Sequence, residues 1–268
     1  MFHAASAAQD ESKRLDELHD AIATYLDGHL SFAPLEGTCP NNILEVGSGS
    51  GAWAIQAATQ FPEATVTAID LSPIPDRPMP YNIKFNQVDL SGSLPFSSQS
   101  FDIVHARLIF IHLPDAPAIL RRICELVRPG GYLLLEEPDC GGVVDQTTPL
   151  GPGFTNFTST WFRLMNSKGQ NLCIGRDLEQ IIRSTGFFTE VNVKKVEIPY
   201  APKSEDPREN VLGQAWRLTS ERTAKVLLSR FGSEGFTSEM IQRLLSELRD
   251  EGRDMRTPLY FTWSRRLS

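Results

Sequence analysis

Residues 43–53 of this 268-residue chain read Ile43-Leu44-Glu45-Val46-Gly47-Ser48-Gly49-Ser50-Gly51-Ala52-Trp53. An apolar run of strand length leads into three alternating glycines, and a helical stretch follows at once. Glycine adopts positive φ and lets a ligand approach the backbone closely, as a tight strand-to-helix turn requires. The segment therefore predicts the first strand, ligand-binding turn and helix of a nucleotide-binding sheet.

The spacing of these glycines fits two ligands. Gly47-x-Gly49-x-x-Ala52 satisfies the dinucleotide fingerprint, and Glu45-x-Gly47-x-Gly49-x-Gly51 satisfies the version that binds a methyl donor. A carboxylate at Glu45 suits the cationic amino group of methionine better than a pyrophosphate. Asp70 ends the next apolar run, where it can accept both ribose hydroxyls of either ligand. Taken alone, these residues leave both ligands open.

Short apolar runs alternate with helical stretches on either side of this turn. The expected strands are Ile43–Val46, Thr65–Ile69, Ile83–Val88, Asp102–His105 and Tyr132–Leu135. The expected helices between them are Ala52–Gln60, Pro117–Val127 and a weak segment around Pro73–Tyr81. Apolar strands alternating with helices predict an α/β fold with a mostly parallel sheet.

The remaining chain adds helices to this core. A helix is expected over residues 10–30, a loop over 141–153, helices over 154–165 and 176–185, a strand over 188–198, mostly helix over 205–253 and a last strand over 259–265. We expect one structural domain with three parts: a helical cap (1–40), a donor-binding core (41–140), and lid helices that also complete the sheet (141–268).

The composition of the chain argues against several classes of partner. The formal net charge is −7 and no dense Lys/Arg run is present, which disfavours nucleic acid. The four cysteines form no CxxC pair, so we expect neither a metal site nor a disulfide framework. The first residues contain no apolar signal segment, and no run is long enough to span a bilayer. We therefore expect a cytoplasmic protein without a membrane partner.

Several ordered blocks across residues 40–140 resemble class I S-adenosylmethionine-dependent methyltransferases. They are Glu45-x-Gly47-x-Gly49-x-Gly51, Asp70, Gln87-Val88-Asp89-Leu90, Pro95-Phe96 followed by Phe101-Asp102-Ile103-Val104, and Leu126-Val127-Arg128-Pro129-Gly130-Gly131-Tyr132-Leu133. Nicotinamide enzymes do not normally carry the Pro-Gly-Gly turn at that place. The resemblance implies a Rossmann-like fold with a mostly parallel, seven-stranded sheet, S-adenosylmethionine as cofactor and S-adenosylhomocysteine as product.

A narrower resemblance is to the LaeA-like methyltransferases of filamentous fungi. It rests on Arg14-Leu15, Asp27-Gly28, Ala33-Pro34-Leu35, Trp53-Ala54-Ile55 and Asp70-Leu71-Ser72-Pro73. Val104-His105-Ala106-Arg107 is also similar to a group of small-molecule methyltransferases. The donor-binding residues that these resemblances imply are Glu45, Gly47, Ser48, Gly49, Gly51, Trp53, Asp70, Leu71, Asp89, Leu90, Ala106 and Arg107.

Methyl transfer from a sulfonium mainly requires alignment of the acceptor and exclusion of water, with a base for some acceptors. The catalytic candidates are Arg107, His112 and Glu137, near the ends of the fourth and fifth strands. Arg107 could instead be a surface residue and His112 a packed one. His105 is expected to be a hydrogen-bonded core residue. Of Glu136 and Glu137, one is expected to face the acceptor while the other is solvated.

Aromatic residues after the fifth strand suggest the acceptor. Phe154, Phe157, Trp161 and Phe162 could close over an apolar or aromatic substrate, although aromatic side chains at helical spacing are more often plain core. Residues 240–248 should pack internally or form an oligomer face, which allows a homodimer. We expect O-methylation of a small molecule in fungal-type secondary metabolism. The alternatives are a LaeA-like regulator acting through protein partners, and a pocket that rearranges a substrate without methyl transfer.

Overall fold

A computed structural model describes the backbone of residues 2–267 and the side chains of residues 10–267. Its centre is an eight-stranded sheet whose main path runs β3-β2-β1-β4-β5-β8-β6, with β7 paired to β8. The strands are β1 (Asn42–Val46), β2 (Thr65–Asp70), β3 (Ile83–Gln87), β4 (Phe101–Arg107), β5 (Val127–Pro138), β6 (Val144–Asp145), β7 (Phe188–Pro199) and β8 (Met255–Arg266). The eighth strand, beyond the seven implied by the resemblance, is the two-residue β6.

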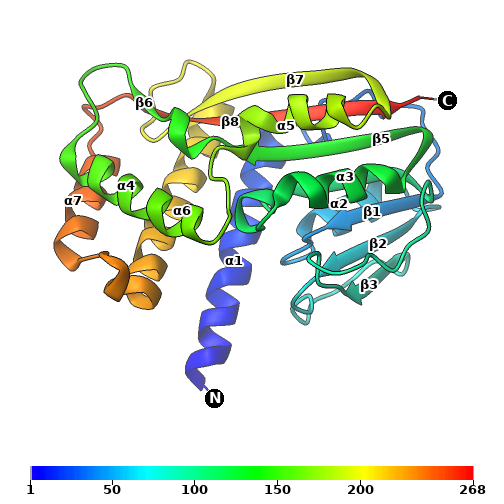
Figure 1. The fold of residues 1–268 in the computed structure, drawn as a ribbon, viewed down its shortest axis with the longest axis horizontal. Coiled ribbons are helices and arrows are strands. Elements are labelled where there is room, and N and C mark those ends of the chain that lie inside the picture. Colours follow the sequence, from blue (N-terminus) through cyan, green and yellow to red (C-terminus); the bar gives the residue numbers. More distant parts are fainter. Residues whose placement is uncertain (1, 268) are drawn as a thin grey trace.

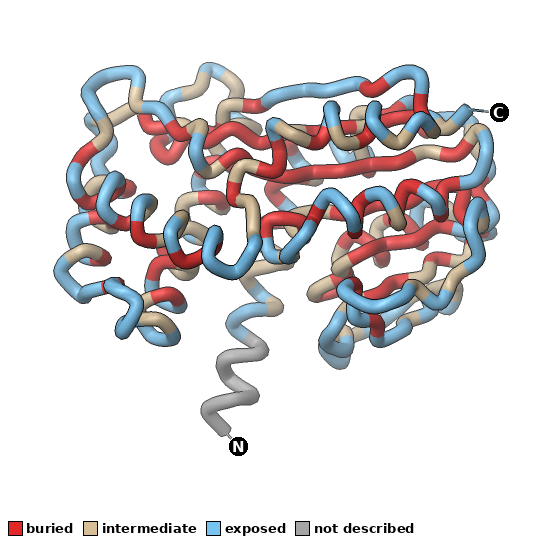
Figure 2. Tube along the Cα trace, in the orientation of Figure 1, coloured by how far each residue is buried: buried red, intermediate tan, exposed pale blue. Residues whose placement is uncertain are grey.

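The strands β1 to β5 run parallel, and β8 lies antiparallel between β5 and β7. The central strands are buried along most of their length (Figure 2). Such strands need apolar residues on both faces, which is why the sequence shows nearly continuous apolar runs there. The predicted mostly parallel α/β fold is confirmed.

Helices α2 (Ala52–Gln60), α3 (Ala116–Leu126) and α5 (Ile174–Ser184) flank the sheet (Figure 1). At the end toward which the arrowheads of β1 and β5 point lie α4 (Pro152–Ser167), α6 (Pro207–Phe231) and α7 (Ser238–Leu248), with α1 (Phe2–Tyr25) between them and the sheet. Short 3₁₀ turns complete the chain: η1 (Phe110–His112), η2 (Cys140–Gly142) and η3 (Gly232–Glu234). The carboxyl ends of the parallel strands therefore face these added helices.

The weak helix expected around Pro73–Tyr81 is absent, and the segment forms bends and extended chain. Four prolines at positions 73, 75, 78 and 80 explain the difference. Each proline lacks the N–H that a helix interior needs and disfavours a helical conformation in the residue before it. The segment is left as a long connection from β2 to β3.

The aromatic stripe after β5 is largely core. Phe154 and Phe157 are buried, and the Phe157 ring centroid lies 5.8 Å from that of Trp161 and 5.7 Å from that of Phe236. On α7 the buried face consists of Ile241, Leu244 and Leu248, and α7 packs on α4 and α6. That face packs within the chain and is not free to form an oligomer contact. Among helices in the described part of the chain, none has the length and apolarity of a bilayer span.

Candidate functional site

The glycine turn between β1 and α2 is confined by neighbouring side chains. Gly47, Gly49 and Gly51 have φ values of +74°, +52° and +80°, which residues with a Cβ rarely adopt. A Cβ at Gly47 would lie 2.9 Å from Ile109 Cγ1, and one at Gly49 would lie 3.0 Å from Leu15 Cδ1. The turn is therefore held between α1 and the corner that follows β4.

Asp70 fixes this turn from the end of β2. Its Oδ2 accepts the Gly49 N–H at 2.9 Å, and its Oδ1 accepts the Ser72 N–H at 2.9 Å. A carboxylate oxygen has two lone pairs, so each oxygen can accept one further hydrogen bond. Asp70 thus anchors the turn and still offers two acceptors, as a ribose diol requires.

Glu45 is a buried carboxyl beside the turn. Its side chain is 4% exposed, and its Oε2 has no hydrogen-bond partner. Burial raises the pKa of Glu45 to about 8, against the opposing effects of Arg107 and the Ala54 N–H. A buried acceptor without a partner is costly, and a cationic ligand group would satisfy it. The amino group of S-adenosylmethionine fits this position.

Arg107, at the end of β4, joins a buried polar cluster. Its Nε donates to Glu136 Oε2 at 2.5 Å, and its Nη1 lies 3.2 Å from His19 Nδ1 on α1. Burial is the largest influence on Glu136 and opposes its ionisation, but Arg107 and the nearby His105 together outweigh it, so the pKa of Glu136 is lowered. Burial and then Arg107 lower the pKa of His19 to about 3, so its ring is neutral and accepts from the guanidinium. Arg107 is therefore not an ordinary surface residue.

His105 and Trp53 form a stacked pair in the core. Their ring centroids are 3.8 Å apart with an interplanar angle of 6°, and Trp53 Nε1 donates to the Leu30 carbonyl at 3.3 Å. Neither ring nitrogen of His105 has a hydrogen-bond partner, since Glu136 Oε1 lies 3.8 Å away. His105 is thus buried as expected but not hydrogen-bonded. The Trp53 indole packs α2 onto β4. Only the backbone of Trp53 is therefore left to contact the methyl donor.

Both glutamates at the end of β5 are buried, so the expectation that one is solvated is wrong. Glu136 is 2% and Glu137 0% exposed, because β5 lies between β4 and β8 with both faces covered. Glu137 Oε1 accepts the N–H groups of Ile109 and Phe110, at 2.7 and 2.8 Å. Glu137 thus contacts the backbone of the corner after β4.

His112 ends η1 and is an exposed residue. Desolvation by the surrounding protein lowers the pKa of His112, and the positive charge of Arg14 lowers it further. Its carbonyl accepts from Gln170 Nε2 at 2.5 Å, which ties the corner to the connection between α4 and α5. Of the three catalytic candidates, His112 is the exposed residue, and its pKa is lowered.

The other residues predicted to bind the methyl donor fall into an exposed and a buried group. Leu71 is 65% exposed directly after β2. Asp89 is exposed after β3, where its Oδ1 accepts from the Ser91 N–H and hydroxyl and these bonds lower its pKa. Because β2 and β3 are neighbours, these two side chains lie at the same edge of the sheet. The buried members are Ser48, Leu90 and Ala106.

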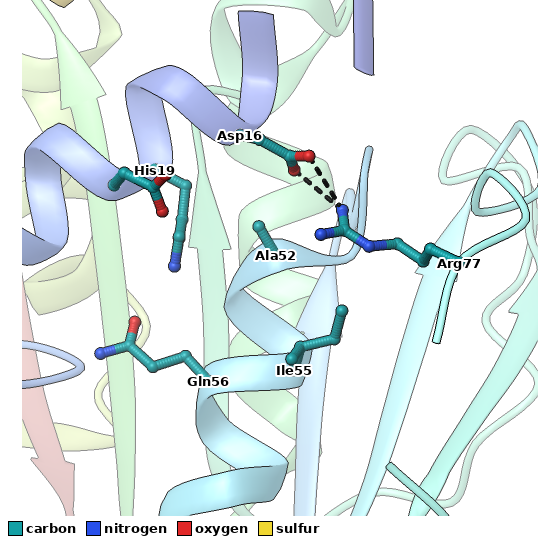
Figure 3. A pocket seen from close by; sticks show the side chains of 7 residues that line it. Asp16, His19, Ala52, Ile55, Gln56 and Arg77 are labelled. Carbon is teal, nitrogen blue, oxygen red and sulfur yellow. Dashed lines mark hydrogen bonds and ion pairs between the residues drawn. The ribbon is translucent and has the colours of Figure 1, made fainter. Parts of the chain in front are cut away.

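Three residues of this region were missed by the sequence analysis: Asp16 and His19 on α1, and Arg77 in the connection after β2. Arg77 Nη1 lies 2.9 and 3.1 Å from the two Asp16 oxygens and 3.0 Å from the Ser50 carbonyl. The pair closes one side of a cavity of about 280 Å³ between α1 and α2, into which His19 also points (Figure 3). No local motif marks these residues, since they meet only through tertiary packing.

Comparisons with known proteins agree with this geometry. A family model described as a methyltransferase domain matches residues 15–190. Methyltransferase str2 of Strobilurus tenacellus is 37% identical over 242 residues, which cover 87% of each chain. Secondary metabolism regulator laeA of Aspergillus fumigatus is 27% identical over 254 residues, which cover 91% of this chain and 66% of that protein.

Among solved structures, phosphoethanolamine N-methyltransferase 2 of Haemonchus contortus, in complex with phosphomonomethylethanolamine and S-adenosylhomocysteine, has a TM-score of 0.56 at 20% identity. The match covers 93% of this chain and 53% of that one, so this chain spans about half its length. This likeness shows the fold. The S-adenosylhomocysteine in that complex is what remains of S-adenosylmethionine, the predicted cofactor, after methyl transfer.

Proposed function

Since the chain belongs to the family of S-adenosylmethionine-dependent methyltransferases and is similar to their fungal LaeA-like group, we propose that it methylates a small organic acceptor. The observation that carries the proposal is the buried Glu45 oxygen without a partner, directly beside a turn of three glycines with positive φ. A turn that only reversed the chain would not need an unsatisfied carboxyl there. A ligand with a cationic amino group would supply its partner.

The donor is proposed to lie across the carboxyl ends of β1, β2 and β3. Glu45 would accept from its amino group, and Asp70 would accept from its ribose hydroxyls. Leu71 would cover the adenine, and Asp89 would accept from the exocyclic amine. Arg107 would act at the methionine end, where its positive charge opposes the burial that raises the pKa of Glu45.

The acceptor is proposed to be a hydroxyl compound, with His112 as the base. The bound donor supplies an electrophilic methyl group on its sulfonium. A neutral imidazole can take the proton that a hydroxyl loses as it is methylated, and the lowered pKa of His112 keeps the ring neutral at neutral pH. Trp161 and Phe162, which are half-buried on α4, are the aromatic side chains available to an apolar acceptor.

The test combines a binding and a turnover measurement. Labelled S-adenosylmethionine is incubated with the protein and panels of phenols, carboxylic acids and amines. A His112→Ala variant should lose most turnover of a hydroxyl acceptor but keep its affinity for S-adenosylhomocysteine. Transfer to amines only, or full turnover by the variant, would contradict the oxygen assignment.

A second function is a regulatory protein that binds the donor but acts through a protein partner. The observation that favours it is the likeness to laeA across 91% of this chain. A regulator should bind S-adenosylmethionine, form a stable complex with a partner and yield no acceptor-dependent product. An acceptor that is methylated at a rate typical of enzymes would favour catalysis instead.

A further inference from the structure

The corner after β4 has an unusual backbone conformation and is held by hydrogen bonds to residues of β5. Leu108 has a φ of +53°, which is uncommon for a residue with a side chain, and its N–H donates to the Glu136 carbonyl at 2.9 Å. The next two N–H groups, of Ile109 and Phe110, donate to Glu137 Oε1. The 3₁₀ turn that follows has no capping side chain of its own. Glu137 is thus its main polar support.

This corner contacts both halves of the proposed site. Ile109 packs directly against Gly47, since a Cβ at Gly47 would lie within 3.2 Å of three Ile109 side-chain atoms. The next residue, Phe110, is fully buried and anchors the corner in the core. His112, at the end of the same turn, presents the proposed base. A shift of this corner would therefore move the glycine turn and His112 together.

We propose that Glu137 is a positioning residue that fixes the corner after β4 and, through Ile109, the glycine turn, and that it does not take a proton from the acceptor. Glu137 is fully buried, and its Oε1 already accepts two backbone hydrogen bonds. The link to methyl transfer rests on the proposed function, whereas the link between the corner and the glycine turn rests on these contacts alone.

The chemistry of the carboxyl distinguishes positioning from proton transfer. Burial raises the pKa of Glu137 to about 8, so the group is mostly neutral at neutral pH. A glutamine has the same shape, is neutral and keeps a carbonyl acceptor. Glu137→Gln should therefore preserve the corner, whereas Glu137→Ala leaves two backbone N–H groups without their acceptor.

Asp102 provides a matched control at the opposite end of the sheet. Its Oδ2 also accepts two consecutive backbone N–H groups, from Asn41 at 2.9 Å and Asn42 at 2.7 Å. Asp102 is 5% exposed, also pairs with Arg128, and is the second residue of β4, whereas the corner follows the last residue of that strand. Asp102→Ala should destabilise the protein in a similar way without disturbing the glycine turn.

The experiment is amide hydrogen exchange on the ligand-free protein, followed over residues 46–53 and 108–113. Glu137→Ala should accelerate exchange at least about tenfold in both segments, and Glu137→Gln should stay within about twofold of the parent. Asp102→Ala should accelerate exchange only near the start of β1. Ile109→Ala, which keeps both hydrogen bonds to Glu137, should loosen the glycine turn but leave the Phe110 amide protected.

Titration with S-adenosylhomocysteine gives the second readout, and Glu137→Ala should bind it at least about tenfold more weakly while Glu137→Gln binds normally. A glycine turn that exchanges normally in both Glu137→Ala and Ile109→Ala would overturn the proposal. So would a Glu137→Gln variant as impaired as Glu137→Ala. If the parent protein fails to bind S-adenosylhomocysteine, the proposed function fails, and the exchange data still decide the role of Glu137.

Discussion

Glu45 is the single residue on which the donor assignment depends, and it predicts a pH dependence of binding. Its raised pKa, to about 8, means that the free protein holds a proton there at neutral pH. A bound cationic amino group would lower that pKa and release the proton. Affinity for S-adenosylhomocysteine should therefore rise between about pH 5.5 and 7.5, by up to roughly tenfold per pH unit.

Calorimetry in two buffers of different ionisation enthalpy measures this directly, because it counts the released protons. The upper limit of the range stays below the pH at which an α-amino group itself loses its charge. Glu45→Gln cannot release a proton and should give a flat profile with weaker binding. A flat profile in the parent protein would show that Glu45 does not meet the amino group.

Individual residues could be predicted from the sequence wherever their role is local. The glycines, Glu45 and Asp70 lie within one strand, turn and helix or at the next strand end, so their positions follow from the order of the elements. Trp53 was assigned to the methyl donor through the family resemblance, and in the structure its indole is buried in the core. His19 and Arg107 are 88 positions apart in sequence, and no local pattern indicates that they meet.

At the scale of elements, α4 depends on a cap supplied by another helix. Its N-cap residue is Gly151, which has no side chain to accept a hydrogen bond. Glu247 of α7 takes over this role, with Oε1 accepting the Gly153 N–H at 2.7 Å and Oε2 accepting the Phe154 N–H at 2.8 Å. A negative charge also suits the positive end of the helix dipole. One side chain thereby joins two helices of the lid.

Replacing this cap should weaken the lid measurably. Glu247→Ala is expected to lower the free energy of unfolding by about 1–2 kcal/mol, as the loss of other helix caps does. Glu247→Gln keeps one acceptor and should lose about half as much. Urea denaturation of the three proteins makes the comparison, with Glu239→Ala, an exposed residue of α7, as the control. Equal stability of Glu247→Ala and the parent protein would rule out the cap.

The elements themselves could be predicted where a hydrophobic period is strong. Ala52–Gln60 matches α2, and the predicted strands all lie within or next to observed ones. The segment 73–81 was wrongly assigned because a helix was expected between two parallel strands, although its prolines argued against one. The position of α1 beside the glycine turn is a tertiary contact, so its periodicity could predict a helix but not its neighbours.

For the whole molecule, buried titratable groups predict how stability changes with pH. Burial raises the pKa of Glu45 and of Glu137 to about 8, whereas the unfolded chain ionises both near 4.5. The folded protein therefore holds protons that the unfolded chain releases, and stability falls as pH rises toward 8. The lowered pKa values of His19 and His105, about 3 and about 4, affect stability only below about 6.5.

The range from about pH 6.5 to 8 thus isolates the two carboxyls. Across it, the free energy of unfolding should fall by up to roughly 2 kcal/mol for each carboxyl. Glu137→Gln should remove about half of that fall, as measured by urea denaturation at the two pH values. If the free energy of unfolding of Glu137→Gln fell as much between these pH values as that of the parent protein, Glu137 would be ionised in the folded protein.

For the whole molecule, titration of the purified protein with S-adenosylmethionine, S-adenosylhomocysteine and NAD in a calorimeter is the most direct test of what the glycine turn binds. We expect both S-adenosyl compounds to bind at one site with about micromolar affinity, a typical range for substrates, and NAD to give no heat of binding. Asp70→Asn, which leaves one acceptor oxygen in place of two, should weaken the binding of both S-adenosyl compounds. Binding of NAD without S-adenosylhomocysteine would show that the glycine turn holds a dinucleotide, and the proposed methyl transfer would have to be abandoned.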